Sequence, residues 1–116
     1  MARLSTHVLD LASGKPAAGL KIELYQLNLK RKLLKAVATN SDGRTDQPLL
    51  SGESIPTGKF ELVFYVAEYL KGKKHKLPDP PFLDDVVIRF GIAEAEGHYH
   101  VPLLLSPFGY STYRGS

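Results

Sequence analysis

The stretch HYHVPLLL, His98–Leu105, decides the fold, because large apolar or aromatic residues recur at every second position. Alternate side chains of a β-strand point to opposite faces, so the pattern predicts a strand with one face in the core. The predicted core face consists of Tyr99, Val101, Leu103 and Leu105. The opposite face carries His98, His100, Pro102 and Leu104. Since Pro102 has no backbone N–H, we expect its pairing with one neighbouring strand to be incomplete.

The same alternation occurs at both ends of the chain. In LSTHVLDL, residues 4–11, the positions that suit the core are Leu4, Thr6 and Val8. The outward positions of that stretch are Ser5, His7 and Leu9. In GYSTYRG, residues 109–115, one face carries Ser111, Tyr113 and Gly115. Leucines beside histidines on an outward face predict a surface that a partner subunit covers.

Further strand patterns lie between these stretches. They cover residues 20–27, 32–39, 58–67 and 84–92, and the pattern at 58–67 is the strongest because it is rich in aromatic and β-branched residues. The segment AEYLKGK, residues 67–73, predicts one or two helical turns. Seven or eight short strands separated by turn signals predict an all-β sandwich, and residues 1–116 are expected to form a single domain.

Composition excludes several classes of function. The chain has no cysteine, so disulfides, thiolate catalysis and cysteine metal sites are excluded. No stretch is apolar enough for a membrane helix, and the start lacks the apolar core of a secretory signal. A cytoplasmic location is therefore expected, although a mature chain whose signal had been removed would look similar.

The net charge of +3 comes largely from KGKKHK, residues 71–76. Clustered lysines can bind nucleic acid, but the run has no interleaved aromatic residues and is more typical of a solvated loop. We expect neither a nucleic acid nor a membrane as a partner.

Three segments together carry a resemblance to a known family. They are LSTHVLDLASGKPAAGLKIELYQL near the start, TNSDGRTD in the middle and HYHVPLLLSPFGYSTYRGS at the end. They resemble the transthyretin-related proteins, the 5-hydroxyisourate hydrolases of urate breakdown. The ending Tyr-Arg-Gly-Ser is the family's most specific mark, and the hormone-carrier branch lacks it.

The resemblance implies an architecture and an activity. It implies a transthyretin-like sandwich of seven to eight strands with one short helix, assembled as a homotetramer that is a dimer of dimers. A channel between the dimers would be lined by the outward faces of the first, seventh and last strands. The implied reaction, part of purine metabolism, hydrolyses 5-hydroxyisourate to 2-oxo-4-hydroxy-4-carboxy-5-ureidoimidazoline, with no cofactor and no metal.

Candidate catalytic and substrate-binding residues follow from the resemblance and from the outward faces. Histidine suits the activation of water near neutral pH, so His100 is favoured as the general base and His7 as its partner in orienting water and substrate. His98 shares the face of His100 and ranks second. The alternative is that each is a structural histidine, which is the usual role of a histidine taken singly.

The other candidates depend on the resemblance. It implies that Arg44, in the turn SDGR, offers planar donors to the substrate carbonyls. It implies that Tyr113 binds substrate and that Ser116 brings a hydroxyl beside the terminal carboxylate. Arg114 has the opposite parity and is expected to anchor the chain end, while Gly115 permits close approach of the backbone.

Two rival functions remain. A carrier of hydrophobic hormone would use the same channel, but its lining would be small and apolar where this chain has His and Tyr. A zinc protein could use His7, His98 and His100 as imidazole ligands, because two histidines at i and i+2 of one strand share a face.

Overall fold

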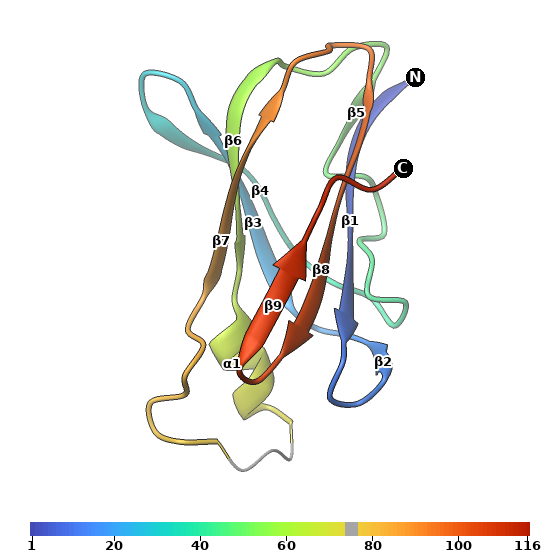
Figure 1. Cartoon of the computed structure of the whole chain (residues 1–116). Helices are drawn as coiled ribbons and strands as arrows, with labels where there is room; N and C mark the ends of the chain where they lie inside the picture. Colours follow the sequence, from blue (N-terminus) through green and yellow to red (C-terminus); the bar gives the residue numbers. More distant parts are fainter. Residues whose placement is uncertain (74–76) are drawn as a thin grey trace.

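The computed structural model describes residues 1–73 and 77–116, and it confirms the β-sandwich. Two sheets face each other, and the only helix in the described residues lies at one end of the sandwich (Figure 1). The first sheet has the order β2-β1-β8-β9, and β5 also pairs with β1. Its strands are β1 (Ala2–Asp10), β2 (Lys15–Pro16), β5 (Leu50–Gly52), β8 (His98–Ser106) and β9 (Gly109–Thr112).

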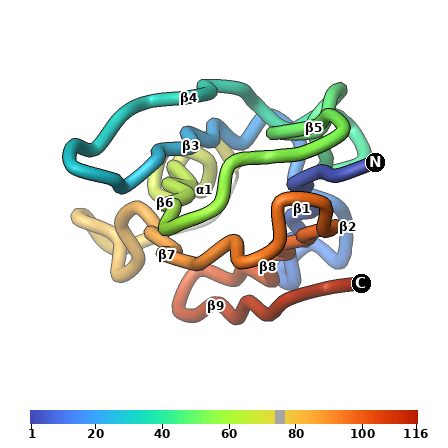
Figure 2. Tube along the Cα trace, turned by 90° about the horizontal axis from the view of Figure 1, so that it is seen from above, coloured from blue at the N-terminus to red at the C-terminus, as the bar shows by residue number. Residues whose placement is uncertain are grey.

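The second sheet has the order β4-β3-β6-β7 and forms the other layer when the molecule is seen from above (Figure 2). Its strands are β3 (Lys21–Leu27), β4 (Arg31–Ala38), β6 (Gly58–Phe64) and β7 (Val86–Ile92). The helix α1 (Val66–Lys71) follows β6 directly, which confirms the predicted helical turns.

The alternation in β1 and β8 is confirmed. The predicted core residues of β8 are all buried: Tyr99, Val101, Leu103 and Leu105. Those of β1 are buried as well: Leu4, Thr6 and Val8. They pack in one core with residues of the second sheet such as Phe60 and Phe64, so the outward faces of β1 and β8 are fixed by the packing of their inward faces.

Two strand expectations need correction. The described residues contain nine strands rather than seven or eight, because the short β2 and β5 were not expected. The last strand ends at Thr112 rather than Gly115, although His100 and Gly115 form an isolated bridge in the same register.

Residues two apart in a strand direct their backbone groups to the same side. The carbonyl of His100 accepts from Gly115, so the backbone nitrogen of Pro102 faces the last strand as well. Because this nitrogen carries no hydrogen, it cannot donate to the carbonyl of Tyr113.

A buried carboxylate joins the helix to the first sheet. Asp10, at the end of β1, is 1% exposed. The hydroxyl of Tyr69 in α1 donates to one carboxylate oxygen at 2.8 Å, and the backbone N–H groups of Ala12 and Ser13 donate to the other. These bonds satisfy the buried charge and hold α1 against the end of the sandwich.

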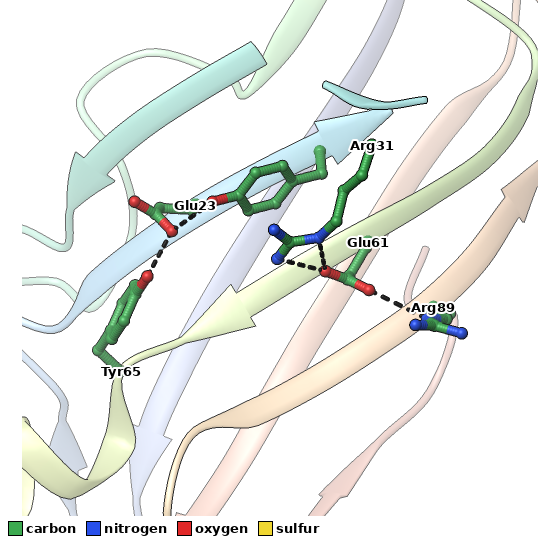
Figure 3. Close-up of polar contacts among 6 residues, drawn as sticks. Glu23, Arg31, Glu61, Tyr65 and Arg89 are labelled. Carbon is green, nitrogen blue, oxygen red and sulfur yellow. Dashed lines mark hydrogen bonds and ion pairs between the residues drawn. The ribbon is translucent and has the colours of Figure 1, made fainter. Parts of the chain in front are cut away.

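The outer face of the second sheet carries a second satisfied carboxylate (Figure 3). Glu61 of β6 is 3% exposed and accepts from Arg31 of β4 at 2.7 Å and from Arg89 of β7 at 3.0 Å. Burial alone would raise the pKa of Glu61, but the two guanidiniums hold it below its usual value. Glu23 nearby accepts from the hydroxyls of Tyr25 and Tyr65.

The lysine run predicted at residues 71–76 falls partly on residues 74–76, which lie outside the described residues. In the described part of the chain, no helix has the length and apolar character needed to cross a bilayer.

Candidate functional site

The outward face of β1 and β8 brings together the two histidines favoured from the sequence. The two strands run parallel, with Ser5 opposite His100 and His7 opposite Pro102. His7 and His100 therefore project from neighbouring strands on the same side of the sheet, and both are half-buried. The face lies opposite the core, so its side chains are free of the packing that fixes the inward residues.

The imidazole of His100 is held on two sides. Its Nδ1 lies 2.8 Å from the hydroxyl oxygen of Ser5. On the other side the backbone N–H of Gly115 donates to the carbonyl of His100 at 2.8 Å. A Cβ at position 115 would stand 2.6 Å from Cδ2 of the ring, so only glycine leaves room for the imidazole. The expected close approach of the backbone at Gly115 is thus confirmed.

His7 is held by the turn that follows β4. Its Nε2 lies 2.9 Å from the carbonyl oxygen of Asp42. Because a carbonyl oxygen only accepts, Nε2 is the donor of this bond. The contact joins the first strand to a turn 35 residues away in the sequence.

The turn at residues 40–46 is stabilised from within and from β1. The side-chain oxygen of Asn40 accepts from the backbone N–H groups of Asp42 and Arg44, a pattern typical of Asx turns. Gly43 has φ +74°, and a Cβ there would meet the carbonyl oxygen of Val8 at 2.4 Å. The N–H of Val8 in turn donates to the carbonyl of Gly43 at 2.8 Å. The turn is therefore fixed against β1 at the level of His7.

This turn places Arg44 near Ser5, the hydrogen-bond partner of His100. Arg44 lines a hollow of about 170 Å³ together with Arg3, Ser5 and Pro48. Burial of the ring lowers the pKa of His100, and the charges of Arg44, His7 and Arg3 lower it further. The neutral imidazole is accordingly the favoured form of His100 in the folded chain.

The C-terminal residues lie along β8, where the tail runs on from β9 in both views (Figures 1 and 2). Arg114 donates to the carbonyl of His98 at 3.2 Å and its guanidinium lies 4.2 Å from the centre of the Tyr99 ring. These contacts confirm that Arg114 anchors the chain end. Ser116 is exposed beside Gly115.

Tyr113 lies apart from Arg44 in the single chain. It is 60% exposed and lines a different hollow, of about 240 Å³, where the edge of β7 faces the last residues of the chain. A single chain therefore places His7, His100 and Gly115 on one face, with Arg44 near Ser5, and leaves Tyr113 and Ser116 open to contacts from outside.

His98 stands at the start of β8, opposite Arg3, and is exposed. Among residues 1–73 and 77–116, no group of three or more His, Cys, Asp or Glu side chains has the spacing to hold a metal ion. The three histidines considered as zinc ligands do not form such a group in this chain.

Sequence reasoning missed three contributors to this face: Ser5, Asn40 and the carbonyl of Asp42. A signal existed for Ser5, because it has the outward parity of His7. Asn40 at the head of a Gly-containing turn also fits the usual sequence of an Asx turn. Nothing in the sequence marks the carbonyl of Asp42.

The chain matches a family model and close relatives along nearly its whole length. The model described as the HIUase/Transthyretin family matches residues 4–115. The chain is 61% identical over 115 residues to "5-hydroxyisourate hydrolase 2" of Rhizobium meliloti, covering 98% of this chain and 96% of the relative. It is 64% identical over 115 residues to "5-hydroxyisourate hydrolase" of Mesorhizobium japonicum, covering 98% and 92%.

Solved structures show the same fold. A structure of (S)-allantoin synthase matches with a TM-score of 0.93 and 41% identity, over 99% of this chain and 44% of that one. A 5-hydroxyisourate hydrolase from Klebsiella pneumoniae matches with a TM-score of 0.83 and 31% identity over 100% of both chains. Transthyretin from Sparus aurata matches with a TM-score of 0.85 but only 25% identity, over 97% and 96%.

Proposed function

This chain belongs to the HIUase/Transthyretin family, and we propose that the paired histidines, Arg44 and the C-terminal tetrapeptide form its site for hydrolysing 5-hydroxyisourate. The chain is an enzyme, a hydrolase that acts on 5-hydroxyisourate, as are relatives 61% and 64% identical to it along nearly its whole length. Its identity to the fish transthyretin is 25%, which makes the carrier function the weaker alternative.

One observation supports the location of the site above all others. The imidazoles of His7 and His100 lie on one outward face, each in a hydrogen bond, with Gly115 of the tetrapeptide packed against the second ring. General acid–base chemistry needs such groups at a fixed geometry near the substrate. The core face of the same strands holds mainly apolar side chains, and the carboxylate of its Asp10 is already satisfied by Tyr69 and two backbone N–H groups.

Each residue then has a chemical task. One imidazole accepts a proton from water, and the other donates a hydrogen bond to the carbonyl under attack. Arg44 stays charged throughout the reaction and binds the oxygen-rich heterocycle through planar donors. Tyr113 contacts the substrate, Ser116 contributes its hydroxyl, and His98 has a secondary part at the rim.

The site is completed by assembly into a homotetramer, a dimer of dimers. In support of this proposal, Tyr113 and Ser116 are exposed in the single chain, and Leu104 stands half-covered on the outward face. Sedimentation velocity tests the assembly, and a monomer at working concentration contradicts it.

A direct assay tests the site. 5-Hydroxyisourate is generated in the cuvette from urate, and its ultraviolet decay is followed with and without the protein. We expect acceleration by the wild type and a loss of about 100-fold or more in His100→Ala, in Arg44→Ala and in a chain ending at Thr112. Unchanged decay together with tight binding of a hydrophobic hormone would support a carrier instead. Activity that appears only when zinc is added to a metal-stripped preparation would contradict the cofactor-free mechanism.

A further inference from the structure

The hydrogen bond of His7 leaves only one of its nitrogens able to take a proton. Nε2 donates to the carbonyl oxygen of Asp42 at 2.9 Å, so the neutral ring carries its hydrogen on Nε2 and its lone pair on Nδ1. The turn that supplies this carbonyl is fixed by Asn40 and by Gly43 on β1. His7 therefore has a free acceptor and no free donor.

The residues around Ser5 bear on which nitrogen of the neutral His100 ring carries the hydrogen. The hollow beside Ser5 is lined by two guanidiniums, those of Arg3 and Arg44, which carry donors only. Such cations favour a serine whose oxygen faces them and whose hydrogen points away. The hydroxyls of Thr6 and Thr45, which also line the hollow, have lone pairs, but among the described residues the hydrogen bond of the Ser5 hydroxyl is to Nδ1 of His100, at 2.8 Å. We therefore infer that the serine hydrogen is directed to Nδ1 of His100.

We propose that both neutral imidazoles carry their hydrogen on Nε2 but present different nitrogens to the substrate. Ser5 donates to Nδ1 of His100, which leaves the Nε2–H of His100 as a donor. His7 offers its unprotonated Nδ1 as the general base. Ser5 is then a positioning residue. The inference rests on the proposed function for its chemical meaning, but the proton positions can be measured without any activity. It reverses the expectation from sequence, which favoured His100 as the base.

Protonation of His100 would undo this arrangement. The imidazolium carries N–H on both nitrogens, so Ser5 would have to accept from Nδ1, and its own hydrogen would lose that acceptor. Burial and the nearby charges also keep His100 neutral, and together they outweigh a hydrogen bond to the Ser5 backbone, which raises the pKa of His100. A neutral imidazole donor suits the stabilisation of a developing oxyanion, because it need not lose a proton during the step.

The hydrolytic step balances with these roles. A water proton passes to Nδ1 of His7 as the water oxygen forms a bond to the ring carbonyl carbon. The carbonyl electrons move onto oxygen, which accepts a hydrogen bond from Nε2–H of His100. When the tetrahedral carbon collapses, the C–N bond breaks, and the proton on Nδ1 of His7 passes to the leaving nitrogen.

Nitrogen-15 NMR of the histidine side chains in the full-length protein tests the proton positions directly. The four histidines are assigned with His75→Asn and His98→Asn variants, and spectra are taken above pH 7.5. We expect a protonated Nε2 and a bare Nδ1 in both His7 and His100. A protonated Nδ1 in His100 would overturn the proposal even if the enzyme is fully active.

Substitution of Ser5 tests its positioning role. Ser5→Ala should give His100 a mixture of tautomers and lower kcat about ten-fold with little change in KM. Ser5→Thr should keep the wild-type tautomer and the wild-type kcat, because threonine retains the hydroxyl. The matched control is Ser106→Ala at the other end of β8, which removes a half-buried hydroxyl that donates to the carbonyl of Gly109. An unchanged His100 tautomer in Ser5→Ala would overturn the assignment.

Two glutamine substitutions separate the roles of the rings. The side-chain amide of His100→Gln still donates but cannot act as a base, so we expect it to lose only about ten-fold in kcat. His7→Gln removes the base and should lose about 100-fold or more. The reverse order would overturn the proposal. If the wild type itself does not accelerate the decay of 5-hydroxyisourate, the proposed function fails, and the NMR spectra still decide the proton positions.

Discussion

The imidazole of His100 occupies the space in which a side chain at Gly115 would begin. The N–H of Gly115 donates to the carbonyl of His100 at 2.8 Å, and a Cβ on Gly115 would stand 2.6 Å from Cδ2 of the ring. The penultimate residue of the chain thus forms one wall of the pocket for this histidine, with Ser5 at the opposite side. The C-terminal tetrapeptide therefore shapes the site through its backbone as well as through its side chains.

Gly115→Ala should displace the ring of His100 while leaving the core intact. We expect a loss of about ten- to 100-fold in kcat, because small displacements of catalytic groups have large effects on rate. The melting temperature should change little, since residue 115 lies on the sheet edge outside the core. Gly109→Ala is the matched control, because a Cβ there has its nearest contact at 3.9 Å. Equal activities of the two variants would contradict the role of Gly115.

Gly43→Ala should both destabilise the protein and lower its activity. Gly43 has φ +74° and a Cβ there would overlap the carbonyl oxygen of Val8, whereas Gly14 has φ +72° and nothing within 4 Å. We expect Gly14→Ala to lower the free energy of unfolding by about 1–2 kcal/mol from the backbone alone, and Gly43→Ala by about 2–5 kcal/mol from backbone and overlap together. Urea unfolding measures both.

The same pair of variants separates stability from activity. Gly43 positions the Asp42 carbonyl and Arg44, so its substitution should also lower kcat in the fraction that remains folded. Gly14→Ala should keep the wild-type kcat at a temperature where it is folded. Loss of activity in proportion to unfolding alone, in both variants, would argue against a specific role for the turn.

Arg44→Gln should raise the pKa of His100, because the nearby guanidinium is one of the causes that lower it, after burial of the ring. Proton NMR titration of the His100 ring measures this shift. Hydrolysis should fall by about 100-fold or more through the loss of a charged donor. Lys59→Gln on the second sheet removes the same charge far from the ring and is the control. An unchanged titration of His100 in Arg44→Gln would show that the two groups do not interact.

Much of the fold followed from side-chain alternation. Strands such as β1 and β8 have one apolar face each, and a shift by one residue would expose every core side chain, so their outward residues His7 and His100 could be predicted. The short strand β5 could not, because three residues in a polar segment carry no periodicity. The early end of β9 follows from Pro102, but its effect depends on which side of β8 the last strand occupies.

The contacts within the site could not be predicted from the sequence, for a different reason. Ser5 bonds His100 across 95 residues, and the bond requires the parallel register that sets them opposite each other. His7 bonds a backbone carbonyl, and every residue has one, so no residue type signals it. Proton positions on the rings are set by these partners, which is why the assignment of the base from sequence alone stayed a choice between two histidines.

The stability of the protein should fall as the pH drops through the titration of His100. Burial first, and then the charges of Arg44, His7 and Arg3, lower its pKa in the folded state below the value near 6.5 of an unfolded chain. The unfolded state then binds more protons than the folded state as the pH falls through about 6.5, and the free energy of unfolding decreases until the pH is below the lowered folded-state pKa as well. His100→Gln should show a shallower decrease in urea titrations at several pH values. Parallel curves for the two proteins would contradict the expectation.

Glu61→Gln should weaken the second sheet without affecting catalysis. The carboxylate is 3% exposed and accepts from Arg31 and Arg89, which hold its pKa below the usual value against the effect of burial. A neutral amide keeps the shape, but only its oxygen can accept, so one guanidinium keeps a weaker hydrogen bond and the other loses its partner. Since the guanidiniums are 51% and 74% exposed and can bind water, we expect a loss of only about 1 kcal/mol. The wild type should lose this advantage in acid, because a carboxylate with a lowered folded-state pKa contributes stability that disappears as the pH falls through that pKa. The two proteins should therefore converge in urea titrations below about pH 4.

Glu94→Gln, which removes an exposed carboxylate, is the control and should stay within about 0.5 kcal/mol of the wild type at every pH. Because Glu61 lies on the sheet opposite His7 and His100, a fall in kcat in Glu61→Gln would mean that the two sheets are coupled in a way that the contacts do not predict.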